Sequence, residues 1–229
     1  MISNKEKEIK EFFNKRVRVQ GDKNFSPEIG AKNSSGLMIL DFLKKNISPK
    51  DKILDAGCGE GRFSKYFIED GRDITSMDFS EEYVRLAKKN IGKGKFIVGS
   101  VTEIPFKDNS FDCIFSVDVL QHVPDLKGAI NEFHRVLKKG GKLIIIDKNK
   151  FGVHRKYLIP NKLIQTYREI TTWKYSGFKE RGFNPEKFRN ELGKVFEGAR
   201  FEYLMERNKS SLFKMFPKLN LFVAWIAKK

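Results

Sequence analysis

The sequence predicts an α/β fold built on a parallel sheet, because short buried strands alternate with helices through its central part. Runs such as 142-KLIIID-147 are apolar at nearly every position, as in strands that are covered on both faces. Segments with helical periodicity separate these runs, which is the pattern of crossovers between parallel strands. Glycine at positions 57, 59 and 61, directly after one strand, is typical of a loop that approaches a ligand at the edge of such a sheet.

The elements follow in a regular order. Apolar residues on one helical face predict helices over residues 2–17 and 34–46. Alternating elements come next, with strands predicted over residues 52–56, 73–78, 95–99, 110–118 and 142–147, and helices over residues 62–69, 81–90 and 126–138. Gly140 and Gly141 are expected to end the last of these helices. Beyond residue 147 the pattern loosens, and a helix over 185–195 and strands over 199–207 and 219–229 complete the prediction.

Composition excludes several classes of protein. With 229 residues, 40% of them hydrophobic and 32% charged, the chain is expected to be a soluble globular protein. The charged N-terminus, MISNKEKEIKEFF, lacks the apolar core of a signal peptide, so a cytoplasmic location is expected. No segment reaches the roughly 20 apolar residues of a membrane-spanning helix. Cys58 and Cys113 are the only cysteines and lack metal-ligand spacing, so no metal site is predicted.

Positive charge is concentrated in the C-terminal third. Residues 148–229 contain 19 Lys or Arg and 7 Asp or Glu, and so contribute +12 of the formal net charge of +16. A generally lysine-rich surface would spread this charge more evenly along the chain. The asymmetry therefore indicates an acidic partner, which could be a phosphate-bearing metabolite, a nucleic acid or an anionic membrane surface.

The glycine loop 53-ILDAGCGEGRFSKYF-67 does not match the patterns that bind phosphate. The dinucleotide fingerprint needs a third glycine where this chain has Arg62, and a P-loop would need Gly-Lys followed by Ser or Thr. What remains is an acidic residue, Asp55, followed by glycines that allow close backbone approach. This combination suits a ligand that carries a positive group and no phosphate.

ILDAGCGEGRFS resembles motif I of the class I S-adenosylmethionine-dependent methyltransferases, and the resemblance extends over residues 50–147. ITSMDFSEEYVRLAKKN is similar to the second strand and helix of that family, and residues 99–147 to the rest of its small-molecule, type 11-like branch. The resemblance implies a Rossmann-like, doubly wound sheet of seven strands in the order 3-2-1-4-5-7-6. The last strand would be antiparallel, with helices on both faces and a helical lid. Residues 1–48 would form N-terminal helices or a lid, and residues 49–229 the methyltransferase domain, with a substrate-lid insertion over 148–184.

The resemblance also implies a cofactor, S-adenosyl-L-methionine, with S-adenosyl-L-homocysteine as its product. Asp55 and Gly57 would lie against the methionine moiety, and Asp78 would accept hydrogen bonds from the ribose hydroxyls. A structural alternative for Asp55 is a strand-end cap, and Asp78 could also cap the following helix. Phe79 would pack on the adenine. The full cofactor set implied by the resemblance is Asp55, Gly57, Gly59, Gly61, Asp78, Phe79, Ser100, Val101 and Ser116. Ser100 departs from the family pattern, which usually has Asp after the preceding glycine, so adenine recognition is expected to rest more on the backbone of Val101.

Two residues are candidates for catalysis, because they follow the fourth and fifth strands. His122 has a side chain whose ordinary pKa suits a general base, and its alternative role is to brace its loop. Asp147 could orient or deprotonate an acceptor, or be a polar strand end. Asp118 is expected to cap the next turn and is not included in the catalytic set.

The acceptor is expected to be a small anionic or glycan-type molecule that is methylated on O or N, because residues 148–184 combine basic and aromatic side chains. The alternative for this segment is an amphipathic lid whose aromatic side chains belong to the core and whose lysines are solvated. Two other functions stay open. The first is an RNA or protein methyltransferase that uses the basic C-terminal region. The second is a non-catalytic protein that retains the fold and binds a membrane surface or a partner. The oligomeric state is left unassigned.

Overall fold

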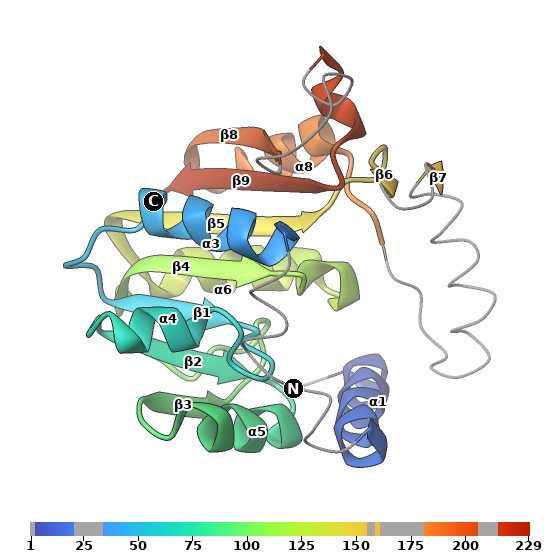
Figure 1. Ribbon diagram of the computed structural model, residues 1–229. Coiled ribbons are helices and arrows are strands. Elements are labelled where there is room, and N and C mark those ends of the chain that lie inside the picture. The colour runs from blue at the N-terminus through green and yellow to red at the C-terminus, as the bar shows by residue number, and fades with distance from the viewer. Residues whose placement is uncertain (1–2, 21–33, 155–158, 161–180, 206–214) are drawn as a thin grey trace.

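The computed structural model describes residues 3–20, 34–154, 159–160, 181–205 and 215–229, and all structural statements concern these residues (Figure 1). Most of the predicted insertion over 148–184 lies outside them. Seven strands form one sheet in the order β3-β2-β1-β4-β5-β9-β8. The strands are β1 (Ile53–Ala56), β2 (Ile74–Asp78), β3 (Lys95–Val98), β4 (Phe111–Val117), β5 (Leu137–Lys148), β8 (Glu197–Leu204) and β9 (Phe222–Lys228).

This order confirms the predicted one, 3-2-1-4-5-7-6. Strands β1 to β5 pair in parallel, whereas β9 pairs antiparallel with both β5 and β8, as expected for the last strand. Two short strands, β6 (Val153–His154) and β7 (Ile159–Pro160), form a separate antiparallel pair. The parallel strands place their carboxyl ends at one edge of the sheet, where ligands bind in folds of this kind.

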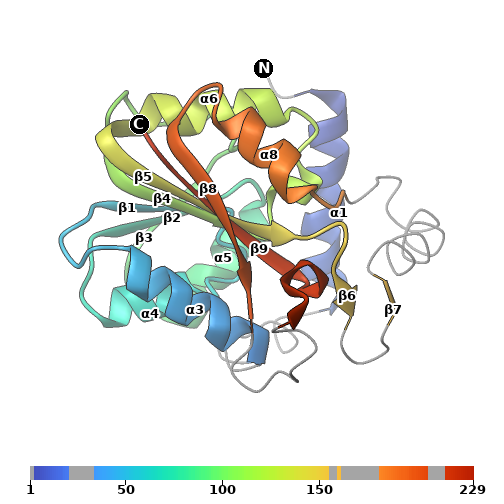
Figure 2. The ribbon, with the colours of Figure 1, turned by 90° about the horizontal axis from the view of Figure 1, so that it is seen from above.

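Helices cover both faces of the sheet, as Figure 2 shows. Helices α6 (Leu126–Val136) and α8 (Pro185–Leu192) lie on one face, and α3 (Ser34–Asn46), α4 (Ser64–Glu69) and α5 (Glu81–Ile91) lie on the other. Strand side chains alternate between these layers. Leu143 and Ile145 of β5 belong to the core cluster that includes residues of α6 and α8, while Ile144 and Ile146 belong to the cluster that includes residues of α3 and α4. Both faces are therefore apolar, which explains the continuous hydrophobic run in the sequence.

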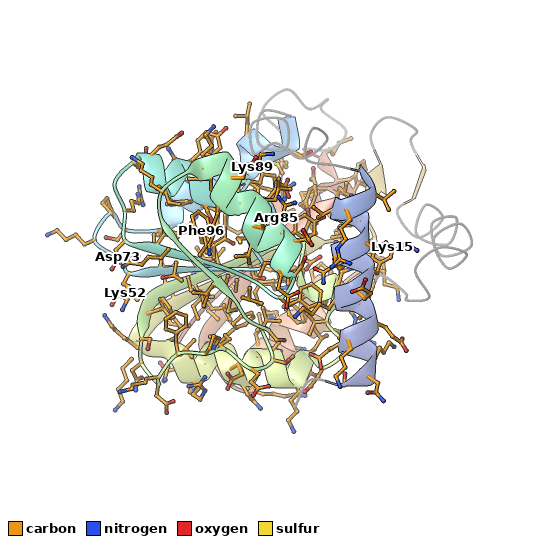
Figure 3. All side chains as sticks on the ribbon, turned by 90° about the horizontal axis from the view of Figure 1, so that it is seen from below. Lys15, Lys52, Asp73, Arg85, Lys89 and Phe96 are labelled. Atoms are coloured by element: carbon orange, nitrogen blue, oxygen red, sulfur yellow. The ribbon has the colours of Figure 1, made fainter. Side chains whose placement is uncertain are left out.

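Helix α1 (Asn4–Gln20) stands apart from these layers, at the carboxyl ends of the strands and beside α5 (Figure 1). Figure 3 shows Lys15 of α1 at the opposite end of the sheet from Lys52 and Asp73, which directly precede β1 and β2. Polar contacts attach the helix to α5. Lys10 Nζ lies 2.6 Å from Glu81 Oε1, and Arg18 Nε lies 3.1 Å from Glu82 Oε1. These ion pairs are partly exposed, so each contributes little to stability.

The predicted end of the helix over residues 126–138 is wrong. Smaller differences occur elsewhere, since α8 ends at Leu192 rather than at residue 195 and β9 begins at Phe222 rather than at residue 219. Helix α6 ends at Val136 rather than at residue 138, and Gly140 and Gly141 lie within β5 instead of ending the helix. The reason is a pairing with β4. Leu137 adopts an extended conformation, is fully buried, and pairs with Phe111. The register of the pairing shifts between Phe111, which pairs with Leu137, and Cys113, which pairs with Lys142. Strand β5 therefore has more residues than β4 between these two pairs, and Gly140, with φ of 74°, is one of them.

Candidate active site

The glycine loop after β1 has a backbone that only glycine adopts easily. Gly57, Gly59 and Gly61 have φ of 96°, 53° and 86°. The backbone N–H groups of Gly57 and Cys58 both donate to the Met77 carbonyl, at 2.7 and 2.9 Å, which ties the loop to β2. A Cβ atom on Gly57 would lie 2.2 Å from Cγ2 of Val119. The loop after β4 therefore packs directly on this glycine, and no side chain fits between them.

Asp78 at the end of β2 receives two backbone hydrogen bonds. Its Oδ2 accepts from Gly59 N at 2.9 Å and its Oδ1 from Ser80 N at 3.0 Å. Ser80 is the N-cap of α5, since its Oγ accepts from Tyr83 N, so the predicted capping role of Asp78 falls to Ser80 instead. Burial raises the pKa of Asp78 to about 6, although the two N–H donors oppose this effect. Each carboxylate oxygen has a second lone pair that can accept a further bond.

Asp55 at the end of β1 is buried and takes part in a chain of hydroxyl groups. Its Oδ2 accepts from Ser64 Oγ at 2.5 Å, and Ser64 Oγ accepts from Ser76 Oγ at 2.8 Å. Burial raises the pKa of Asp55 to about 7, and the hydrogen bond from Ser64 limits the rise. The carboxyl group is thus fixed in place beside the glycine loop.

A cavity of about 510 Å³ lies at this edge of the sheet. Most of the predicted site residues line it: Asp55, Gly57, Gly59, Asp78, Phe79, Ser100, Val101 and His122. Gly61, Ser116 and Asp147 are not among the lining residues. Gly61 lies against α5, where a Cβ atom would come within 2.5 Å of Ile91 Cδ1, and Ser116 Oγ donates to the Ala56 carbonyl at 2.9 Å. These two residues therefore contact neighbouring elements and do not line the cavity.

Asp147 lies beneath the loop that follows β4. The side chain is buried, and its Oδ2 accepts from the backbone N–H of Gln121 at 3.3 Å while its Oδ1 accepts from Lys148 N at 3.0 Å. Burial, together with repulsion from the nearby Asp118 carboxylate, raises the pKa of Asp147 to about 8. Its position therefore allows it to orient the Asp118–His122 loop.

Helix α1 supplies one wall of the cavity, through residues that were not among the predicted site residues. Glu6, Ile9, Phe13 and Arg16 all line the space. Their spacing of three, four and three residues places them on one helical face. This periodicity was the signal that could have identified them, but it could not show what that face contacts.

Glu6 approaches the site at the position where the chain departs from the family pattern. Its Oε1 accepts from Thr102 Oγ1 at 2.7 Å, and Thr102 Oγ1 lies 2.8 Å from Ser100 Oγ. The Glu6 side chain is buried, and its second oxygen accepts from Ser3 at the start of the helix. A carboxylate from α1 is therefore present beside Ser100, in addition to the backbone of Val101.

The loop after β4 contributes more than the predicted His122. Asp118 and Gln121 also line the cavity. Asp118 has φ of 59°, which is unusual for a residue other than glycine, and its Oδ2 lies 3.4 Å from Arg62 Nη2. It was expected to cap a turn, but its side chain pairs with this arginine. Both residues are polar groups directly after a buried strand, which is the sequence signal that could have identified them.

Within the described ranges, no group of three or more His, Cys, Asp or Glu side chains is placed to hold a metal ion. Over the same residues, none of the helices combines the length and apolar character that crossing a membrane requires. Both cysteines are buried and free, and burial raises the pKa of each thiol. Neither thiol is therefore suited to act as a nucleophile.

Comparison with known proteins agrees with this geometry. Residues 54–145 match the model of a family described as a methyltransferase domain. A demethylmenaquinone methyltransferase from Staphylococcus aureus is 32% identical over 169 residues, which cover 66% of this chain and 67% of that protein. A malonyl-[acyl-carrier protein] O-methyltransferase from Hamiltonella defensa is 36% identical over 95 residues, 42% of this chain, and the match spans only 37% of that relative.

A solved structure supports the fold over nearly the whole chain. The crystal structure of an S-adenosylmethionine-dependent methyltransferase from Thermotoga maritima aligns with a TM-score of 0.67 over 96% of this chain and 99% of that one, at 20% identity. Sheet order, glycine loop and relatives lead to the same assignment. The chain belongs to the class I S-adenosylmethionine-dependent methyltransferases, in the type 11 domain family.

Proposed function

We propose that this protein transfers the methyl group of S-adenosylmethionine to an oxygen or nitrogen atom of a small-molecule acceptor. One observation carries the proposal: Asp55, Gly57, Asp78 and Phe79 converge on a single cavity at the carboxyl edge of the sheet. This set fits the chemistry of the cofactor. Carboxyl groups suit its ammonium, sulfonium and ribose hydroxyls, and Phe79 provides an aromatic surface for a base. When bound, the cofactor supplies a methyl group on a sulfur that is already a good leaving group.

The protein therefore has mainly to bind, to orient and to exclude water. Asp78 would hold the ribose hydroxyls, since each of its oxygens has a lone pair beyond the bonds from Gly59 and Ser80. The backbone of Gly57, which lines the cavity, would lie against the methionine moiety. Helix α1 covers the cavity with Ile9 and Phe13, which would limit access of water to the reacting atoms. His122 would accept a proton from a hydroxyl acceptor, because it lines the cavity on the side of the β4 loop.

An acceptor with a phosphate or other anionic group is the finer part of the proposal. Three cationic side chains, Arg16, Arg62 and Lys148, lie on the walls of the cavity. The net charge of +12 over residues 148–229 supports the same expectation. Much of that charge falls on residues 155–158, 161–180 and 206–214, outside the described part of the chain. The charge also motivates the alternative of an RNA or protein acceptor, for which binding would weaken steeply with salt concentration.

Calorimetric titration with S-adenosylmethionine tests the proposal. The wild type should bind with a micromolar dissociation constant, and Asp78→Asn should weaken binding at least about tenfold through loss of charged hydrogen bonds. Asp73→Asn is the matched control, because Asp73 precedes the same strand at the far end of the sheet (Figure 3). Radiolabelled methyl transfer to a panel of phosphorylated amines, sugar phosphates and RNA would then identify the acceptor class. Absence of binding to folded wild-type protein would contradict the proposed function.

A further inference from the structure

Two side-chain oxygens on one wall of the cavity have hydrogen-bonding capacity that the described residues do not use. Asp118 Oδ1 and Gln121 Oε1 are buried, and neither accepts a hydrogen bond from any residue in the described ranges. Leaving a buried polar atom unsatisfied costs about 1–3 kcal/mol, so such atoms are uncommon away from functional sites. Both residues follow β4 and both line the cavity.

Gln121 is held firmly in its orientation. The residue is 3% exposed, and its backbone N–H donates to Asp147 Oδ2 at 3.3 Å. Its backbone carbonyl accepts from Arg181 N at 3.2 Å. The side-chain Nε2 donates to the Asp118 carbonyl at 3.4 Å. Rotating the amide by half a turn would place Oε1 against that carbonyl, and two acceptors would then face each other. The orientation with Oε1 as the acceptor is therefore the favourable one.

Asp118 is fixed by its backbone and by one carboxylate oxygen. Its N–H donates to the Ile146 carbonyl at 2.9 Å, and its φ of 59° requires support from such surrounding contacts. Oδ2 lies 3.4 Å from Arg62 Nη2. The second oxygen, Oδ1, is thus presented on a carboxylate whose position is already determined.

The position of this loop indicates which end of the cofactor the two oxygens serve. Val119, between Asp118 and Gln121, packs on Gly57 so closely that a Cβ atom there would lie 2.2 Å from Val119 Cγ2. Gly57 follows β1, whereas the ribose candidate Asp78 ends the neighbouring strand β2, farther from β4 in the sheet order. The loop therefore flanks the methionine and sulfur end of the cavity, where the acceptor must arrive.

We propose that Asp118 and Gln121 position the methyl acceptor, and that the acceptor is an amine whose N–H groups donate to Asp118 Oδ1 and Gln121 Oε1. This inference rests on the proposed function and narrows it. A neutral amine that donates two N–H bonds to one wall directs its lone pair away from that wall. The nitrogen lone pair forms the new N–C bond, the sulfur keeps the electron pair of the broken C–S bond, and the methylated ammonium releases one proton to water. An amine that also carries a phosphate is compatible with Arg16 and Lys148, which line the same cavity.

A pair of cofactor analogues tests this inference without a known acceptor. In sinefungin, a carbon that bears an amino group replaces the sulfur of S-adenosylhomocysteine, so the amino group projects toward the acceptor side. Calorimetry should show that the wild type binds sinefungin more tightly than S-adenosylhomocysteine, since the amino group supplies donors for the two oxygens. The ratio of these two affinities is the preference for sinefungin. Asp118→Asn retains a residue that tolerates positive φ but removes the charge. Gln121→Met removes the acceptor oxygen at similar volume. Each variant should reduce the preference for sinefungin about tenfold, with affinity for S-adenosylhomocysteine nearly unchanged.

Asp73→Asn is the matched control for Asp118→Asn, because it makes the same change at the far end of the sheet, and it should retain the preference. A preference that is unchanged in Asp118→Asn and Gln121→Met would overturn the inference. So would an equal loss of affinity for both analogues, since the two oxygens would then serve the methionine moiety of the cofactor. If neither analogue bound to the wild type, the proposed function itself would fail, and this inference with it. The three results are distinguishable. The first leaves the variants' preference for sinefungin unchanged, the second lowers the variants' affinities for both analogues, and the third is an absence of binding to the wild type.

Discussion

The ring of Phe13 in α1 meets the ring of His122 nearly edge-on, with centroids 5.2 Å apart and an interplanar angle of 74°. Phe13 also contacts Phe79, at 5.8 Å between centroids, and Tyr83, at 6.1 Å. A single side chain of the N-terminal helix thus touches the candidate base and the candidate adenine-packing residue. Helix α1 and the two loops at the edge of the sheet are therefore expected to close on a bound cofactor together.

Replacement of Phe13 should loosen this arrangement. Phe13→Ala removes the ring contacts that attach α1 to the β2 and β4 loops, so S-adenosylhomocysteine should bind about tenfold more weakly. Amide exchange in α1 should become faster, while exchange in the central strands stays the same. Val19→Ala is the control on the same helix, since Val19 is 75% exposed and should change neither property. Equal affinities of the Phe13→Ala variant and the wild type would show that α1 does not contribute to cofactor binding.

Gly57 should be intolerant of even one added carbon. Gly57→Ala would place Cβ 2.2 Å from Val119 Cγ2 in a residue with φ of 96°, so the β4 loop must move and cofactor affinity should fall at least about 100-fold. Gly71→Ala separates the effect of contact from that of backbone strain. Gly71 has φ of 72° but nothing within 4 Å of an added Cβ atom. The Gly71 variant should lose some stability, about 1 kcal/mol, and keep its affinity for the cofactor. Similar affinities in the two variants would contradict this explanation.

His122 is either a general base or a brace for Phe13, and two substitutions separate these roles. If the acceptor is a hydroxyl instead of the amine inferred above, His122→Ala should reduce methyl transfer about 100-fold or more, because a hydroxyl must lose its proton to a base as it is methylated. His122→Phe keeps an aromatic ring against Phe13 but cannot accept a proton. If His122 is a base, turnover is lost in both variants while affinity for S-adenosylhomocysteine is nearly unchanged in His122→Phe. Normal turnover in His122→Phe would assign His122 a bracing role instead.

The stability of the ligand-free protein should fall as the pH rises from about 4 to 8. Burial raises the pKa of Asp147 to about 8, whereas an unfolded Asp titrates near 3.9. The folded state therefore binds a proton that the unfolded state releases, so the free energy of unfolding decreases over this interval. Burial of Asp55 and Asp78 acts in the same direction, with pKa values of about 7 and 6.

Asp147→Asn removes the largest of these pH-dependent contributions. The variant should gain stability relative to the wild type on going from pH 5 to pH 8, by at least about 1 kcal/mol, or about 2–4 °C in Tm. Any constant cost of the amide at this site cancels in the comparison between the two pH values. Thermal unfolding measured by circular dichroism at both pH values checks the prediction. A difference in Tm that is independent of pH would mean that the Asp147 carboxyl is ionised in the folded protein.

Much of the fold and part of the site follow from the sequence, because they depend on local patterns. Buried strands such as β5 show as continuous apolar runs, and the helices between them as periodic ones. The glycine loop and the acidic strand ends Asp55 and Asp78 are short-range signals, and all of them lie at the predicted edge of the sheet. The misplaced end of α6 marks the limit of such signals, since the pairing of Leu137 with Phe111 overrides the tendency of Gly140 and Gly141 to end a helix.

The rest was decided by tertiary structure, because it consists of contacts between segments far apart in the chain. The approach of Val119 to Gly57 arises from the pairing of β4 with β1, and the burial of Asp147 beneath the Gln121 backbone from the pairing of β5 with β4. No local pattern shows that the face of α1 with Phe13 covers His122. Nor does the sequence show that Asp118 and Gln121 each present a buried oxygen to the same cavity, since hydrogen-bond satisfaction depends on every neighbour in the folded chain.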